Sequence, residues 1–294
     1  MTAVAAAPAP APVVKRKIDW VTVGLYVWGV ATLIFLFLPV ILVTVYSFNS
    51  GPALLVWRGF STEPFGTALA DSQLTGPMIT SVKVALGAAV IATILGTFAG
   101  MALGRRPGKW TVLFIGLIAL VLVTPEIVDG ISMLLWFVQL GDIPGLAFFD
   151  NGLIRLFIGT SLFAVAVVTL IVRARVAGLS ESLEEAAADL YAAPWNRFRQ
   201  VTFPLLAPAI ISGGLLAFSL SLDNTIIAQF VSVGGTATWP VYVWGSVRQG
   251  LKPEVAAMST LLLILTLTSL ILVALVLRRS GASSKEIATT MAGQ

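Results

Sequence analysis

Long apolar stretches separated by short polar ones dominate the hydropathy pattern of this 294-residue chain. Each stretch reaches the length of about 20 apolar residues that a helix needs to cross the hydrocarbon core of a bilayer. The pattern therefore predicts an all-α membrane protein with six transmembrane helices. The expected spans are approximately residues 20–47, 78–103, 110–140, 153–176, 205–230 and 255–277.

The third expected span is interrupted in its middle by Thr124, Pro125 and Glu126, and Asp129 follows one helical turn after the glutamate. A proline inside a helix removes one backbone donor and clashes with the preceding turn. We therefore expect a kink or a local unwinding of this span. If the helix continued through the interruption, Glu126 and Asp129 would share one face.

The longest clearly polar interval, residues 181–208, predicts two short helices. Ser182 and Glu185 have the spacing of a capping box at the start of the first helix. Pro194 suits the first turn of the second helix, which we expect over residues 195–201.

The first of these short helices has a narrow apolar stripe formed by Leu183, Ala187 and Leu190 at helical spacing. An isolated helix of this length is only marginally stable in water. We therefore expect either the membrane domain or a partner protein to hold it in place.

The composition supports a polytopic membrane protein and argues against an enzyme. Hydrophobic residues make up 57% of the chain and charged residues 11%, compared with about half and about a quarter in globular proteins. The chain has no cysteine and no histidine, so it lacks thiol metal ligands and the commonest general base. It contains neither a Walker A sequence nor a Ser/His/Asp set. We expect no catalytic residue, no metal site and no cofactor in this chain.

Basic residues are distributed unevenly over the expected loops, and 13 of the 18 lie on one side of the membrane. They are Lys15, Arg16, Lys17, Arg105, Arg106, Lys109, Arg173, Arg175, Arg197, Arg199, Arg278, Arg279 and Lys285. The positive-inside rule places this side, both termini and the polar interval in the cytoplasm. Membrane topology thus explains the net charge of +4, and we expect no nucleic-acid partner.

The same pattern divides the chain into three parts. Residues 1–17 are expected to form a disordered Ala/Pro-rich cytoplasmic tail with a basic flank, and residues 281–294 a cytoplasmic C-terminal tail. Residues 18–280 are expected to form one six-helix transmembrane domain.

Small residues recur along one face of the second expected span. They are Ala85, Ala89, Ala92, Gly96, Gly100 and Gly104. Such stripes let helix backbones approach closely in a membrane. The pattern favours packing against another helix of the same chain over a seam between two chains.

Three acidic residues lie within the expected spans: Glu126, Asp129 and Asp223, the last followed by Asn224. A charge at the bilayer centre costs about 2.5 to 3.5 kcal/mol on insertion scales, so these groups are expected to face protein or water. Glu126 could line a solute path or bond to backbone groups freed by the kink. Asp223 and Asn224 could line a cavity or serve only packing.

The polar interval contains a motif with a family resemblance. Glu185-Ala186-Ala187, then Tyr191, then Val201-Thr-Phe-Pro204 resembles the EAA loop of ABC importer permeases, E-A-A-x3-G-x9-I-x-L-P. Tyr191 replaces the usual Gly, and because Tyr tolerates a positive φ poorly the geometry of this turn stays open. In that family the loop forms coupling helices that dock in a groove of the ATPase subunit. The resemblance assigns to this coupling loop, residues 181–204, the residues Glu184, Glu185, Ala186, Ala187, Asp189, Tyr191, Trp195, Phe198 and Pro204.

Four further segments, residues 125–131, 221–224, 239–242 and 248–260, are similar to the second permease of spermidine/putrescine importers. Two departures are Asn224 in place of a second acid and Ala256 in place of Asn. The resemblance implies a MetI-like type I ABC importer fold in a bacterial cytoplasmic membrane. It also implies transport of a polyamine. The candidate residues for its path are the polar groups of the spans, Glu126, Asp129, Asp223 and Asn224.

The resemblance further implies several partners. They are a second homologous permease, two ATPase subunits that bind ATP and Mg²⁺, and an extracytoplasmic binding protein. The sequence leaves three alternatives open: an importer permease for another small solute, a proton- or ion-coupled secondary transporter that uses the intramembrane carboxylates, and a membrane scaffold without transport.

Overall fold

The computed structural model describes residues 20–54, 56–105 and 108–279. The two tails expected at residues 1–17 and 281–294 lie outside the described residues. The chain divides into two compact units, Met1–Val45 and Tyr46–Gln294.

The first unit contributes nearly all of helix α1, Trp20–Tyr46, which is 27 residues long. No residue of α1 is buried, and its sequence is apolar enough for a membrane span. The hydroxyl of Thr32 donates to the carbonyl of Trp28 at 2.9 Å, which hides a polar group against the helix backbone. The expected first span is thus present as a helix.

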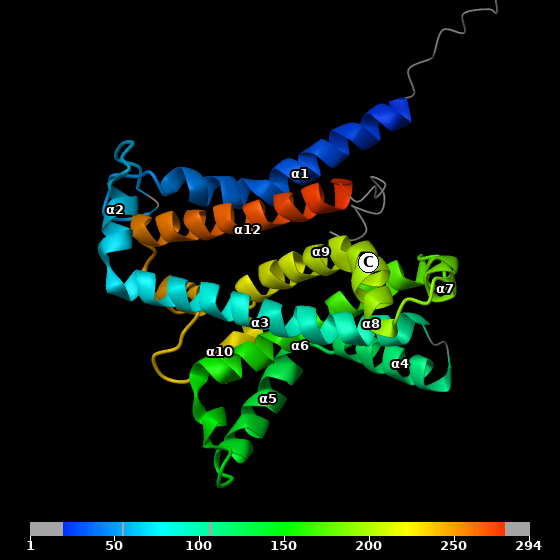
Figure 1. Ribbon diagram of the computed structural model, residues 1–294. Coiled ribbons are helices and arrows are strands. Elements are labelled where there is room, and N and C mark those ends of the chain that lie inside the picture. The colour runs from blue at the N-terminus through cyan, green and yellow to red at the C-terminus, as the bar shows by residue number, and fades with distance from the viewer. Residues whose placement is uncertain (1–19, 55, 106–107, 280–294) are drawn as a thin grey trace, which may run out of the picture. The chain divides into compact units, whose positions relative to one another are not determined.

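The second unit is built from helices in the order shown in Figure 1. They are α2 (Glu63–Ala70), α3 (Ser72–Arg105), α4 (Lys109–Val123), α5 (Glu126–Gly141), the 3-10 helix η1 (Ala147–Asp150), α6 (Gly152–Ala177), α7 (Ser182–Asp189), α8 (Pro194–Arg197), the π-helix η2 (Phe198–Thr202), α9 (Phe203–Leu222), α10 (Ile226–Val231), α11 (Trp239–Ser246), the 3-10 helix η3 (Val247–Gln249) and α12 (Pro253–Arg279). In the described parts of the chain the only extended pairing is one isolated bridge, Asn49 with Phe60. The all-α class is confirmed.

Five described helices are long and apolar enough to cross a membrane: α1, α3, α6, the continuous stretch Pro194–Leu222 that ends in α9, and α12. The pair α4 and α5 makes a sixth crossing if it is counted as one broken span. The chain bends by 103° at the break between the two helices. The break falls at Thr124 and Pro125, both of which have an extended ψ. The interruption expected from the proline is therefore confirmed.

One expected span ends earlier than the hydropathy suggested. The prediction of an apolar helix over residues 205–230 is wrong at its C-terminal end, because α9 stops at Leu222 and α10 begins at Ile226. Local side-chain bonds compete with the helix here. Asn224 Oδ1 accepts the backbone N–H of Ala228 at 3.3 Å, and Thr225 Oγ1 donates to the carbonyl of Asp223 at 3.2 Å.

Helices α3, α6 and α9 form the core, and α3 and α6 pack so closely that the small residues of α3 are required. A Cβ added at Gly96 would lie 2.7 Å from Val168, and one at Gly100 would lie 2.8 Å from the backbone oxygen of Thr169. The prediction that the small-residue stripe packs within the chain is confirmed.

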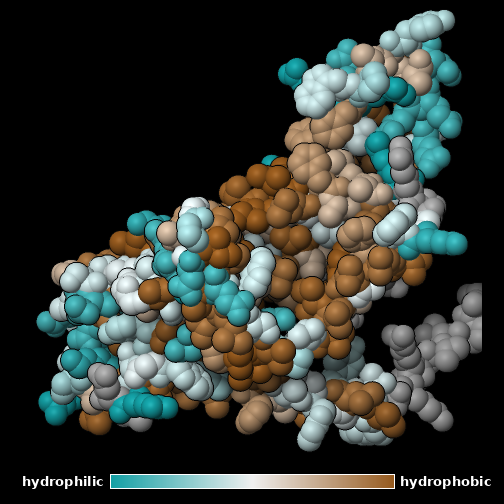
Figure 2. Space-filling model, turned by 90° about the horizontal axis from the view of Figure 1, so that it is seen from below, coloured by the Kyte–Doolittle hydropathy of each residue, from teal (hydrophilic) through white to brown (hydrophobic). Residues whose placement is uncertain are grey.

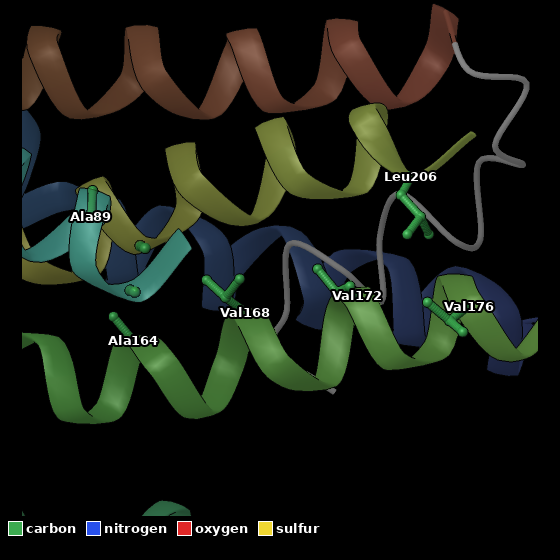
Figure 3. Close-up of a cluster of buried hydrophobic side chains, with 8 residues drawn as sticks. Ala89, Ala164, Val168, Val172, Val176 and Leu206 are labelled. Carbon is green, nitrogen blue, oxygen red and sulfur yellow. The ribbon is translucent and has the colours of Figure 1, made fainter. Parts of the chain in front are cut away.

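The buried side chains at this contact form a cluster with α9. Figure 3 shows Val168, Val172 and Val176 projecting from the same side of α6, with Leu206 of α9 nearby. Val168, Val172 and Leu206 are fully buried. Dispersion between β-branched side chains and the small residues of α3 therefore holds the three helices together.

The surface reflects the membrane environment. Figure 2 shows hydrophobic residues filling the middle of the visible face and hydrophilic ones gathering toward its ends. Many large apolar side chains are exposed on the long helices, for example Phe98 and Val90 on α3 and Ile271 on α12. In lipid such exposure is the favourable state rather than a cost.

Candidate functional site

The polar interval forms two short helices joined by a tight turn, and it lies at one end of the core helices (Figure 1). The first helix is α7. Its predicted capping box is wrong, because the N-cap position is Glu181 and no side chain caps the helix. Ser182 is already inside the first turn, where its hydroxyl bonds to that of Ser180 at 2.6 Å instead.

The second expected helix starts at Pro194 as the sequence suggested, but it is not a separate helix. α8 ends at Arg197 and continues through the π-helix η2 directly into α9. The backbone N–H of Phe203 donates to the carbonyl of Phe198, five residues back. Pro204 accounts for the wider turn, because it lacks the N–H for an ordinary helical bond and crowds the carbonyl four residues before it.

The turn between α7 and α8 settles the geometry that the sequence left open at Tyr191. Tyr191 has a φ of 59°, the left-handed conformation that a glycine would adopt without strain. The N–H of Ala192 donates to the carbonyl of Ala187 at 3.1 Å, and that of Tyr191 donates to Ala188 at 2.9 Å. These two bonds make a Schellman motif, in which the left-handed residue follows the helix. The strain at Tyr191 is about 1 to 2 kcal/mol.

Large apolar side chains are exposed along this loop. Leu190, Tyr191 and Trp195 are 82%, 96% and 67% exposed, although the ring of Trp195 lies beside that of Phe198 at 5.6 Å between centroids. Large apolar and aromatic side chains exposed on a polar loop are typical of protein-protein contact sites.

The remaining loop residues expected from the motif are divided between exposed and inward positions. Glu185, Ala186 and Asp189 are exposed, whereas Ala187 is half-buried. Pro204 lies exposed at the start of α9. The exposed carboxylates of Glu185 and Asp189 have no ion pair within the described residues.

Glu184, by contrast, points inward and joins three elements. It forms an ion pair with Arg105, the last residue of α3, and accepts a hydrogen bond from the hydroxyl of Thr202 at 2.6 Å. Arg105 also donates to the oxygen of Thr202 at 3.2 Å. We call these three residues the Arg105–Glu184–Thr202 network. An ion pair of this exposure is worth about 0 to 1 kcal/mol, so its main effect is on geometry rather than stability.

Sequence reasoning missed two members of this network. Arg105 was interpreted only as a charge that orients the membrane helices, and Thr202 is a variable position of the motif. No spacing connects positions 105, 184 and 202 in the sequence. A further bond of the same kind runs from Arg175 Nε at the end of α6 to the carbonyl of Leu205 at 3.2 Å.

The acidic residues of the spans lie at the two helix breaks. Glu126 and Asp129 occupy the first turn of α5, where carboxylates are favoured by the helix dipole, and Asp223 is the C-cap residue of α9. Glu126 and Asp129 are half-buried and Asp223 is exposed. Within the described residues none of the three forms an ion pair or a side-chain hydrogen bond. The interpretation that Glu126 bonds to freed backbone groups therefore has no support.

The helices that follow the two breaks, α5 and α10, pack against each other. A Cβ added at Gly130 of α5 would lie 2.7 Å from the ring of Phe230 on α10, and Asn224 accepts the N–H of Ala228 in the first turn of α10. Asn224 thus has a structural role besides any contact with a solute. Within the described residues, no hydrogen bond or ion pair joins the carboxylates of α5 to that of Asp223.

The far end of α5 is held by a buried cation. Arg155 of α6 is 5% exposed and pairs with Asp150 at 2.7 Å, and its guanidinium also donates to the carbonyl of Phe137 at 3.4 Å. The hydrogen bonds of this arginine offset its desolvation and fix α5 to α6.

These features define a class. A chain whose described part has five or six apolar helices, broken at polar sites, and a short helical loop at one end is a multi-pass membrane protein. Residues 92–281 match the family described as binding-protein-dependent transport system inner membrane component, and the chain belongs to this family. It is therefore an inner-membrane permease, and the resemblance seen in the loop motif is confirmed.

Curated relatives with named functions cover most of the chain. It is 41% identical over 232 residues to the putrescine transport system permease protein PotI of Escherichia coli K12, covering 78% of this chain and 82% of that protein. It is 31% identical over 247 residues to the spermidine/putrescine transport system permease protein PotC of Haemophilus influenzae, covering 84% and 93%.

Solved structures show the same fold at low identity. A chain of a bacterial ABC transporter involved in the import of the acidic polysaccharide alginate matches with a TM-score of 0.63 at 17% identity, covering 92% of this chain and 99% of that one. A chain of an amino acid ABC transporter matches with a TM-score of 0.52 at 21% identity, covering 75% and 100%. The MetI-like importer fold expected from the sequence is confirmed.

Proposed function

We propose that this chain is one membrane-spanning half of an ATP-driven importer for a polyamine such as putrescine or spermidine. The observation that carries the proposal is the 41% identity to a putrescine permease over 78% of the chain. The unpaired acids of the spans, Glu126, Asp129 and Asp223, support it because a polyamine is a flexible polycation.

The acids would act as weak and successive acceptors. A carboxylate and an ammonium about 4 Å apart attract each other by roughly 4 kcal/mol at an effective dielectric constant of 20. Desolvation of the two charges offsets much of this attraction. A path of several such sites would pass a polyamine without trapping it, and the partner permease would supply further acceptors.

The proposal includes the partners and the orientation. A second homologous permease completes the path, two separate ATPase subunits bind ATP and Mg²⁺, and an extracytoplasmic binding protein delivers the solute. Both termini and the coupling loop lie in the cytoplasm, as the distribution of basic residues indicates. This chain then has no catalytic residue and no cofactor of its own.

The exposed face of the coupling loop is the proposed contact with the ATPase subunit. Leu190, Tyr191 and Trp195 offer apolar and aromatic surface, and the free carboxylates of Glu185 and Asp189 flank it. Closure of the two ATPase subunits on each other would displace the loop and rock the core helices between outward and inward states.

Family membership argues against the ion-coupled alternative, because relatives in this family work with a binding protein. An importer permease for another solute remains the competing proposal. The experiment that separates them uses the purified complex in proteoliposomes, with external binding protein and radiolabelled putrescine.

We expect uptake that requires internal ATP, persists when an ionophore collapses the proton gradient, and is inhibited by unlabelled spermidine. Uptake driven by a proton gradient without ATP would contradict the importer mechanism. Uptake of a neutral or anionic solute, but not of putrescine, would contradict the polyamine assignment alone.

A further inference from the structure

Helix α7 is not held in place by apolar packing. It has no buried residue. Between it and the ends of α3 and α6 lies a cavity of about 400 Å³, lined by Gly104, Val176 and Ala188 among others. A helix that buries no side chain gains little from the hydrophobic effect. Its position relative to the core must depend on other contacts.

Those contacts are provided by the Arg105–Glu184–Thr202 network. Among the described residues, the side-chain bonds from α7 to α3 and to the segment that opens α9 all end on the carboxylate of Glu184. Thr202 is 2% exposed, and its hydroxyl both donates to Glu184 and accepts from Arg105. Three elements that are distant in the sequence therefore meet at one carboxylate.

The two residues that Glu184 contacts lie where displacement would have the greatest effect. Arg105 is the last residue of α3, and Thr202 immediately precedes α9. Both helices belong to the core that packs around α6. Thr202 also lies within η2, a π-helical turn of the kind found at hinges and functional sites. A shift of α7 would thus reach the ends of α3 and α9 directly.

We propose that Arg105 and Thr202 are positioning residues for transport, which act through Glu184 to pass movement of α7 to α3 and α9. The inference rests on the proposed function, because the displacement of α7 is attributed there to an ATPase subunit. The side chains of Arg105 and Glu184 are 43% and 35% exposed, so water screens the pair and its loss leaves the fold intact.

The test is the coupling between ATP hydrolysis and transport in the purified full complex. Thr202→Val keeps the shape of the side chain but removes its hydroxyl, whereas Thr202→Ser keeps the hydroxyl. For Thr202→Val we expect putrescine transported per ATP hydrolysed to fall by about 2-fold to about 30-fold, with the ATPase still bound. Thr202→Ser should retain the wild-type ratio. Stimulation of hydrolysis by the binding protein should fall in parallel in Thr202→Val, and this readout does not require putrescine to be the solute.

A charge exchange provides the second arm of the test. Arg105→Glu and Glu184→Arg should each lower the ratio, and the double variant should recover it because the ion pair is restored with reversed polarity. Lys109→Ala, which removes an exposed positive charge at the start of α4, is the matched control and should behave as wild type.

Two outcomes would overturn the inference alone: a wild-type ratio in Thr202→Val, or a double variant no better than the single ones. Failure of the wild-type chain to co-purify with any ATPase subunit would overturn the proposed function and this inference with it.

Discussion

The polar residues of the coupling loop and those of the membrane spans are arranged in opposite ways. Glu184 in the loop is paired with Arg105 and hydrogen-bonded to Thr202, so its charge is used within the chain. Glu126, Asp129 and Asp223 at the helix breaks have no such partner among the described residues. A partnered carboxylate fixes the position of a backbone, whereas an unpartnered one remains able to bind a passing cation.

The same contrast extends to apolar residues. On the long helices, exposed apolar side chains face lipid and need no protein partner. On the coupling loop, exposed Leu190 and Tyr191 lie on a polar segment outside the spans, where exposure to water is unfavourable. An exposed apolar side chain therefore indicates a protein contact site only where it lies outside the membrane.

The largest expected effect is an all-or-none difference in labelling. The chain contains no cysteine, so single cysteines report their position without background. Cysteine at Ser182 should react with an impermeant thiol reagent only after the membrane is opened. Cysteine at Ser246 should react in cells whose outer barrier admits the reagent. The reverse pattern would place the coupling loop outside the cell and would contradict its assignment as the contact with the ATPase subunit.

Charge reversal on the exposed side of the loop should have the next largest effect. Glu185→Arg should leave the chain inserted but lower the amount of co-purified ATPase by about tenfold or more, because like charges placed across an interface are unfavourable and about 1.4 kcal/mol already corresponds to tenfold. Glu185→Gln removes the charge without reversing it and should give an intermediate loss. Recovery of the ATPase at the wild-type level with Glu185→Arg would show that this face is not the contact.

Neutralising an unpartnered acid should reduce transport without affecting assembly. Asp223→Asn keeps the size of the side chain and should lower putrescine uptake several-fold, whereas stimulation of ATP hydrolysis by the binding protein should persist. Asn224→Asp is the matched variant, because it restores the second acid of the related permeases and still accepts the N–H of Ala228. It should raise or preserve uptake. Normal uptake by Asp223→Asn would make Asp223 a packing residue.

The smallest expected effect concerns the strained turn. Tyr191→Gly relieves about 1 to 2 kcal/mol of left-handed strain. The added freedom of the unfolded chain costs about 0.5 to 1 kcal/mol. The net gain should lie between about 0 and about 1.5 kcal/mol, measured as a small rise in the midpoint of thermal unfolding of the purified chain. Tyr191→Ala keeps a Cβ and should show no gain, so a similar rise for both variants would attribute the effect to the lost ring instead.

Part of this structure follows from local properties that any segment carries by itself. The long helices are determined by the length and hydropathy of each stretch, since a bilayer of fixed thickness requires about 20 apolar residues. The break between α4 and α5 follows from Pro125, whose ring and missing N–H act on its immediate neighbours. The coupling loop was recognisable because its motif is contiguous.

Other features were misjudged because a local pattern competed with another local interaction. Hydropathy alone extended the fifth span to residue 230, but Asn224 and Thr225 bond to nearby backbone and end the helix at Leu222. Ser182 and Glu185 have capping-box spacing, yet the helix begins with Glu181 as its N-cap residue. Both errors concern helix ends, where several weak hydrogen bonds of similar energy compete.

The sequence by itself determined which segments enter the membrane, where one of them breaks, and which loop carries the family motif. Only the tertiary structure decided that the stripe of small residues on α3 meets α6, that Tyr191 adopts a left-handed conformation, and that Arg105 and Thr202 meet at Glu184. The physical reason is the distance along the chain over which each interaction acts. Hydropathy and proline act over a few neighbouring residues, whereas Arg105 and Thr202 are brought within hydrogen-bonding distance only when α3, α6 and α9 have packed together.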